Sequence, residues 1–324
     1  MEKRTLGPWQ VSPLGLGCWA IGGPFWAEQE PLGWGDVDDQ ESTRAIHAGL
    51  QAGINFFDTA DVYGAGHSEQ VLGKALRDVP RDQVVVATKF GNTFDPLSKQ
   101  VTGQSATPEY IRQALAASLD RLQMDHLDLI WFHLNDYAAE EAVEVAETLE
   151  SLVAEGQLTA YGWSTDFPDR AQVFQQYPNC IGFQFEFNVV SPNPMLEFCH
   201  QHQVAGVNRG PLAMGLLSGK YHRAEQISPK DIRRASPEWM RYFHDGIPDP
   251  TMIKQLNSVR DILTSNGRSL VQGALAWIWA SSPWTLPIPG FRTVAQVEEL
   301  TAAREFGPLS SDQMAEIDRL MSSL

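Results

Sequence analysis

Cysteine is scarce in this sequence, and the few cysteines follow no pattern. Only Cys18, Cys180 and Cys199 occur among 324 residues, at irregular spacing and without a CxxC pair. An odd, scattered set does not make a disulfide framework, and it matches neither a zinc-binding nor a thioredoxin-like motif. We therefore expect a protein of a reducing compartment, most simply the cytoplasm, and no metal site.

Long apolar runs and an excess of positive charge are also lacking. No stretch of about 18 apolar residues occurs, and residues 1–10 lack the apolar centre of a signal peptide. Lys and Arg number 24 against 40 Asp and Glu, which gives a formal net charge of −16. Nucleic acid and anionic membranes need a basic surface, so we expect neither as a partner. Any anionic ligand has to be held by a local group of donors.

What the sequence does contain is a repeated alternation of strand and helix patterns. Seven apolar runs are continuous rather than alternating, which is typical of strands covered on both faces. Helical spacing of apolar residues follows in between, over 142–153 before Gly156 and over 111–122 after Thr107 as N-cap and Pro108. The predicted strands are Ile54–Phe57, Val84–Thr88, Leu127–Phe132, Ala160–Trp163, Ile181–Phe185, Val204–Val207 and Thr285–Ile288.

About eight strand–helix units without a break in composition predict a parallel α/β protein, either a closed barrel or a doubly wound open sheet. An open sheet usually carries G-x-G-x-x-G after its first strand, and neither "GLGCWAIGG" nor "GAGHSE" fits that pattern. We therefore predict one (β/α)8 TIM barrel over residues 1–324. Residues 4–17 are expected to form an N-terminal β-hairpin, and 222–250 a long loop or lid.

Four polar residues, which we call the tetrad, stand where predicted strands end. Asp58, Lys89 and His133 each follow an apolar run, and Tyr63 lies in the loop after Asp58. Each has an ordinary alternative, a helix cap for Asp58 or a solvated charge for Lys89, but the run before Lys89 is too apolar for a surface edge. Because strand ends meet at one mouth of a barrel, we expect the four side chains to share a pocket.

This set is suited to protonating a carbonyl oxygen. A free tyrosine has a pKa of about 10, and an ammonium about 4 Å away contributes roughly 4 kcal/mol at an effective dielectric near 20. We therefore expect Lys89 to lower the pKa of Tyr63 by roughly three units. Tyr63 would be the general acid, with Asp58 orienting Lys89 and His133 donating a hydrogen bond to the substrate oxygen.

The motifs "FFDTADVYG", "VATKFG" and "LDLIWFHLND" resemble the catalytic motifs of the aldo-keto reductase superfamily. The resemblance runs from "LGLGCW" to "PIPGFRT", nearly the whole chain. It implies a (β/α)8 barrel that binds NADP(H) without a Rossmann fold. It also implies hydride transfer between the nicotinamide and the carbonyl of an aldehyde, ketone or sugar-like substrate, with Asp58, Tyr63, Lys89 and His133 as catalytic residues.

The same resemblance implies where the cofactor would lie. "YGWSTD" and "GFQFEFN" match the carboxamide site, with Thr165 standing where asparagine is usual, and "NRGPLAMGLLSGKY" matches the pyrophosphate loop. Arg209 is either a stacking residue beside the nicotinamide or the partner of a carboxylate. The expected cofactor-binding residues are Gly17, Cys18, Trp19, Asp58, Ser164, Thr165, Gln184, Arg209, Gly210, Pro211, Leu212, Gly215, Leu217, Ser218, Lys220, Ile288, Gly290, Phe291, Arg292, Thr293, Gln296 and Glu299.

Arg292, in "PIPGFRTVAQVEEL", is expected to grip a 2′-phosphate at the start of a helix, which would favour NADPH over NADH. Leu300 replaces an asparagine that is common in the family. The expected substrate-facing residues are Trp19, Trp34, Tyr63 and His133, and Trp163 faces either the mouth or the core.

Three alternatives stay open on the sequence alone. Barrels also host Schiff-base aldolases with a strand-end lysine, here Lys89. A non-catalytic, nucleotide-sensing subunit could share the fold. An enzyme that works mainly in the oxidative direction, on a sugar or secondary alcohol, would use the same residues. In each enzymatic case the partner is a small carbonyl or alcohol, and oligomeric state stays unassigned.

Overall fold

Eight parallel strands form the centre of the molecule in a computed structural model that describes residues 1–221, 224–235 and 237–323. They pair in the order β16-β13-β12-β11-β10-β7-β6-β3. Their bounds are β3 (Leu16–Gly17), β6 (Phe56–Asp58), β7 (Val85–Phe90), β10 (Leu127–Phe132), β11 (Leu158–Ser164), β12 (Cys180–Glu186), β13 (Ala205–Arg209) and β16 (Thr285–Pro287).

The two outer strands of this order meet and close the sheet. The N–H groups of Gly15 and Gly17 donate to the carbonyls of Pro287 and Pro289, both at 3.0 Å, and Gly17 forms a parallel bridge with Gly290. The predicted (β/α)8 barrel is therefore confirmed.

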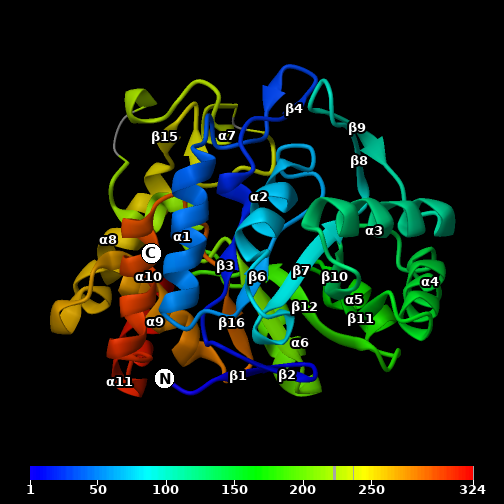
Figure 1. Cartoon of the computed structure of the whole chain (residues 1–324). Coiled ribbons are helices and arrows are strands. Elements are labelled where there is room, and N and C mark those ends of the chain that lie inside the picture. The colour runs from blue at the N-terminus through cyan, green and yellow to red at the C-terminus, as the bar shows by residue number, and fades with distance from the viewer. Residues whose placement is uncertain (222–223, 236, 324) are drawn as a thin grey trace.

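Helices surround the barrel (Figure 1). The two helices predicted from apolar spacing are present: α3 starts at Pro108, where the Thr107 side chain accepts from the N–H of Tyr110, and α4 ends just before Gly156. Within the described residues no helix is long and apolar enough to cross a membrane. The helices are α1 (Asp39–Gln51), α2 (His67–Leu76), α3 (Pro108–Leu122), α4 (Ala142–Ala154), α5 (Pro168–Phe174), α6 (Met195–His202), α7 (Ile232–Ala235), α8 (Pro250–Leu263), α9 (Leu270–Ser281), α10 (Val294–Phe306) and α11 (Ser311–Ser322).

All seven predicted strands are present, most with ends moved by one or two residues. Strand β7 runs to Phe90, so Lys89 lies inside the strand rather than after it. The barrel strand missing from the prediction is β3, which spans only Leu16–Gly17 and is too short to show a pattern.

The two ends of the barrel carry different additions (Figure 1). The predicted N-terminal hairpin, β1 (Arg4–Leu6) with β2 (Trp9–Val11), lies at one end. The other end carries a small sheet and the lid region. The small sheet comprises β4 (Trp26–Ala27), β5 (Glu30–Pro31), β8 (Asn92–Asp95) and β9 (Gln100–Gln104).

The lid segment, residues 222–250, is more regular than predicted. It contains α7 and the antiparallel pair β14 (Phe243–His244) and β15 (Ile247–Pro248). Residues 222, 223 and 236 of this segment lie outside the described residues. The described residues of the lid contact the loops at the mouth, since Asp231 forms a bridge with Trp34 and the Trp239 ring lies 6.4 Å from that of Trp19.

Candidate active site

Lys89 connects Asp58 and Tyr63 of the tetrad at the end of the barrel. Its Nζ donates to Asp58 Oδ1 at 2.5 Å, to the carbonyl of Thr59 at 2.7 Å and to the Tyr63 hydroxyl at 3.2 Å. Lys89 and Asp58 are each 1% exposed. Burial lowers the pKa of Lys89, but Asp58 and Tyr63 outweigh burial and raise it above the ordinary value. The ammonium is therefore charged, and its three protons are all used.

Asp58 accepts hydrogen bonds from two further side chains. The sequence did not predict that both would contact the same carboxylate. Its Oδ2 accepts from Trp131 Nε1 at 2.9 Å and from Gln184 Nε2 at 2.8 Å. Burial raises the pKa of Asp58 above its ordinary value, by more than Lys89 and these two N–H groups lower it. Because every partner is a donor, the arrangement matches the ionised carboxylate.

Trp131 reaches Asp58 because the barrel interior leaves room for its indole. A Cβ added to Gly162 would lie 2.5 Å from Trp131 Cζ3 and 2.2 Å from the carbonyl of Gly182. Any side chain at position 162 would therefore displace the indole and remove one donor from Asp58. Gly162, in "YGWSTD", thus positions the tetrad indirectly.

Tyr63 lies in a loop held tightly against the first barrel loop. Gly64 has φ of 64°, and a Cβ there would lie 1.8 Å from the carbonyl of Gly22, so only glycine fits after Tyr63. The Tyr63 ring stacks on Trp19, with centroids 5.6 Å apart and planes 15° apart.

The expected lowering of the Tyr63 pKa is wrong in this structure. Burial raises the pKa of Tyr63 by more than Lys89 lowers it, and the Asp58 carboxylate adds to the rise. The expectation counted the ammonium and left out desolvation of the phenolate. Tyr63 is consequently a protonated phenol at neutral pH.

His133 follows β10 and lies beside Tyr63. The two ring centroids are 6.0 Å apart and the planes are nearly perpendicular. Burial, together with the cations Lys89 and Arg209, lowers the pKa of His133 well below its ordinary value. A neutral imidazole has a single N–H, and Nδ1 has no hydrogen-bond partner among the described residues. His133 is therefore suited to donate a hydrogen bond rather than to carry a charge.

Indole rings form one side of the mouth. Trp34 meets Trp19 edge-on, with centroids 5.5 Å apart, and Trp239 of the lid lies 6.4 Å from Trp19. Trp239 is 52% exposed and was not among the expected residues. Trp163, by contrast, is fully buried and donates to the carbonyl of Leu134 at 2.9 Å, so it belongs to the core.

The side chains expected at the carboxamide site differ in their hydrogen-bond partners. Ser164 Oγ lies 3.4 Å from Gln184 Oε1, directly beside Asp58. The Thr165 hydroxyl donates to the carbonyl of Asn135 at 2.7 Å and accepts from the N–H of Phe167 at 3.2 Å. The hydroxyl protons of Thr165 and Ser164 are thus both used within the protein, by the carbonyl of Asn135 and by Gln184 Oε1, and the Ser164–Gln184 pair reaches Asp58 through Gln184 Nε2.

Arg209 pairs with carboxylates, which is the alternative to stacking that the sequence left open. Its guanidinium pairs with Asp166 and lies 3.5 Å from Glu186. Glu186 also accepts from Arg241 at 2.7 Å and from Tyr242, both in the lid segment. These pairs hold Arg209 in place and connect it to the lid.

The expected pyrophosphate loop has an unusual backbone. Its turn, Ala213–Ser218, has positive φ at Ala213, Met214 and Gly215, and Gly219 follows with φ of 67°. Successive left-handed or turn residues direct N–H groups to one side, which suits an anion. The turn has the backbone of an anion-binding loop, and its use for a diphosphate stays a prediction, because the N–H groups of Ala213, Gly215, Leu217 and Gly219 donate to carbonyls within the loop.

Arg292 and Thr293 lie at the start of α10 as expected, but both are already engaged. Arg292 donates to the carbonyls of Trp34, at 3.0 Å, and Asp36. Thr293 caps α10, and the N–H of Val294 donates to Glu41 Oε1 at 2.9 Å. A carboxylate at this helix start opposes a phosphate, whereas the guanidinium attracts one. Leu300 is buried in the core.

A sequence model of the Aldo/keto reductase family matches residues 13–322. The chain belongs to this family. The NADH-specific methylglyoxal reductase of Escherichia coli is 30% identical over 318 residues, which are 94% of this chain and 93% of the relative. The glycerol dehydrogenase AKR11B4 from Gluconobacter oxydans is a solved structure 27% identical, with a TM-score of 0.81 over 99% of this chain and 95% of that chain. An aldo/keto reductase from Klebsiella pneumoniae, solved with NADP and acetate, is 26% identical, with a TM-score of 0.70 over 99% and 95% of the two chains.

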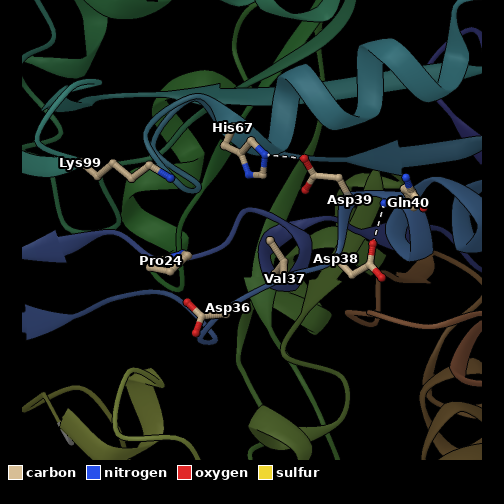
Figure 2. A pocket seen from close by; sticks show the side chains of 8 residues that line it. All are labelled: Pro24, Asp36, Val37, Asp38, Asp39, Gln40, His67 and Lys99. Carbon is tan, nitrogen blue, oxygen red and sulfur yellow. Dashed lines mark hydrogen bonds and ion pairs between the residues drawn. The ribbon is translucent and has the colours of Figure 1, made fainter.

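A separate depression of about 540 Å³ in this aldo/keto reductase is not part of the expected site (Figure 2). Figure 2 shows His67 facing Asp39, and their contact is 3.0 Å long. Asp36 and Asp38 also line it, and none of the expected site residues does. Its three carboxylates make it a poor place for a phosphate-bearing cofactor.

Proposed function

We propose that this aldo/keto reductase is an NADP(H)-dependent oxidoreductase that reduces the carbonyl of aldehydes, ketones or sugar-like substrates, with Tyr63 as general acid. The observation that carries the proposal is the contact of Lys89 Nζ with both Asp58 Oδ1 and the Tyr63 hydroxyl. Together with family membership, this contact supports proton transfer from Tyr63 to a carbonyl substrate in the mouth of the barrel.

The side chains divide the work in the following way. The cofactor, when bound, supplies the hydride to the carbonyl carbon. Tyr63 gives its proton to the carbonyl oxygen, and the Lys89 ammonium stabilises the phenolate that remains. His133, neutral because its pKa is lowered, donates a hydrogen bond to the same oxygen. Asp58 keeps Lys89 charged and oriented.

The chain's own residues are compatible with the cofactor at three places. Ser164 and Gln184 lie beside Asp58, where a carboxamide would bind. The turn over 213–218 suits a diphosphate, and Arg292 supplies a guanidinium at the start of α10. The Klebsiella pneumoniae neighbour was solved with NADP, which supports the phosphorylated cofactor. The carboxylate of Glu41, from α1, lies at the start of α10 and opposes a 2′-phosphate there. The preference for NADPH is therefore tested against NADH.

Replacement of Arg292 by alanine tests the choice of cofactor. Charge-assisted hydrogen bonds contribute about 1.5–3 kcal/mol each, so we expect KM for NADPH to rise about tenfold or more. KM for NADH should change much less, because NADH lacks the 2′-phosphate. Steady-state kinetics with both cofactors measure this, and an equal rise in both constants would remove the reason for naming NADPH.

Single-turnover oxidation of bound NADPH by a panel of carbonyl compounds tests the function itself. Oxidation by at least one class of carbonyl is the expected result. No oxidation by any of them would favour a nucleotide-sensing protein. The aldolase alternative has little support, because the raised pKa of Lys89 leaves almost no neutral amine for attack. A borohydride-trapped substrate adduct on Lys89 would revive it.

Oxidation of an alcohol is the second candidate, and one solved neighbour is a glycerol dehydrogenase. The pKa of Tyr63 separates the two directions by their pH dependence. Reduction uses the protonated phenol, which is present below its pKa, so kcat/KM should stay level from about pH 6 to 9 and fall above about pH 10. Oxidation uses the phenolate, so kcat/KM for the alcohol should rise about tenfold per pH unit from about pH 6 to 9. A loss of reduction between about pH 6 and 8 would show that the pKa of Tyr63 is lowered instead.

A further inference from the structure

Arg292, two residues before α10, contacts a loop segment as well as the helix that follows it. The 33–36 segment, Gly33 to Asp36, runs between β5 and α1. Arg292 Nη1 donates to the carbonyl of Trp34 and Nη2 to that of Asp36. One guanidinium therefore holds two carbonyls of the segment, and no phosphate is needed for these contacts.

The opposite side of the 33–36 segment is held by the lid. The N–H of Ile232 donates to the carbonyl of Gly33 at 2.8 Å, and Trp34 forms an antiparallel bridge with Asp231. Lys230 Nζ pairs with the Asp36 carboxylate at 3.0 Å. The segment is thus fixed on one side by Arg292 and on the other by the lid.

Trp34 connects the 33–36 segment to the mouth of the barrel. Its ring contacts Trp19 edge-on at 5.5 Å, and Trp19 stacks on Tyr63 at 5.6 Å. The guanidinium of Arg233 lies 4.8 Å from the Trp34 ring on the lid side. Movement of the 33–36 segment would therefore move the indole that faces a substrate beside Tyr63.

We propose that Arg292 is a positioning residue for the carbonyl substrate, acting through the 33–36 segment and Trp34. The proposal rests on the reductase function proposed above. A guanidinium has five N–H groups, of which only two are needed for the two carbonyls. The remaining groups have no partner among the described residues and can meet a phosphate, so Arg292 joins the phosphate end of the cofactor site to the substrate mouth. The two ligands are then coupled through this one side chain.

Kinetics with saturating NADH isolate the positioning role, because NADH has no 2′-phosphate. Under these conditions Arg292→Ala is expected to raise KM for the carbonyl about fivefold, with kcat changed by less than about twofold. Arg292→Lys keeps the charge but loses the planar fork, so it should keep part of the affinity for NADPH and still show the raised carbonyl KM. An unchanged carbonyl KM in Arg292→Ala would overturn the proposal.

Helix α10, which follows Arg292, provides a matched control. Arg304, near the other end of α10, donates to the carbonyl of Ala52, remote from the mouth. Arg304→Ala removes a similar contact between a guanidinium and a loop carbonyl, and it should leave the carbonyl KM unchanged. In the Trp34→Ala background, Arg292→Ala should add no further rise. Full additivity of these two changes would contradict the route through Trp34.

Hydrogen exchange of the protein without cofactor gives a readout independent of activity. Peptides covering residues 33–37 are expected to exchange about tenfold faster in Arg292→Ala than in wild type or Arg304→Ala. If no carbonyl is turned over, the proposed function fails, and exchange alone decides whether Arg292 fixes the segment. Wild-type exchange in Arg292→Ala would overturn the inference whatever the activity.

Discussion

Replacement of Tyr63 by phenylalanine is expected to lower the rate of hydride transfer to a carbonyl by about 10³-fold. Loss of a positioned general acid typically costs 10²–10⁴-fold, and the raised pKa means that Tyr63 carries its proton at neutral pH. Phenylalanine keeps the ring that stacks on Trp19, so binding of the cofactor should hardly change. Single-turnover oxidation of bound NADPH measures the rate, and titration of cofactor fluorescence measures binding.

Tyr110→Phe is the matched control for this experiment. The Tyr110 hydroxyl donates to the carbonyl of Asn92 at 3.1 Å, outside the tetrad, so its loss removes a comparable hydrogen bond. The rate should stay within about twofold of wild type. If Tyr63→Phe and wild type have equal rates, the proton comes from another group, and the roles given to Lys89 and Tyr63 are wrong.

The barrel was predictable because most of its strands are long and apolar. Leu127–Phe132 matches its predicted bounds, and Thr107 caps its helix as expected. The strand β3 escaped because two residues carry no periodicity, and it is defined only by partners far along the chain. Barrel closure thus depends on contacts that local pattern does not record.

In the candidate site, too, residues within one motif could be predicted, whereas contacts between residues far apart in sequence could not. Asp58, Tyr63 and Lys89 could be found because each stands at or near a strand end within a recognisable motif. Trp131 lies 73 residues from Asp58 in sequence and Gln184 lies 126, so their shared carboxylate appeared only in the structure. The direction of the Tyr63 pKa was missed for a related reason, since desolvation depends on everything that surrounds the phenol.

Lys89→Met is expected to reduce both activity and stability. Without the ammonium, stabilisation of the phenolate falls by roughly 4 kcal/mol at an effective dielectric near 20, which corresponds to about 10³-fold in rate. The change also leaves the Asp58 carboxylate buried with Trp131 and Gln184 as its side-chain donors in the described part of the chain. Removing one partner of a buried pair typically costs about 3–5 kcal/mol, measurable as the free energy of unfolding in urea.

Adding Asp58→Asn to Lys89→Met separates the two losses. The asparagine oxygen can still accept from Trp131 and Gln184, and its NH₂ can donate to the carbonyl of Thr59, which Lys89 otherwise contacts. The double variant should therefore regain most of the lost stability, because no unpaired charge stays buried. It should regain none of the rate, since the cation beside Tyr63 is still missing. Recovery of activity along with stability would show that Lys89 serves folding alone, and that the phenol transfers its proton without a neighbouring ammonium.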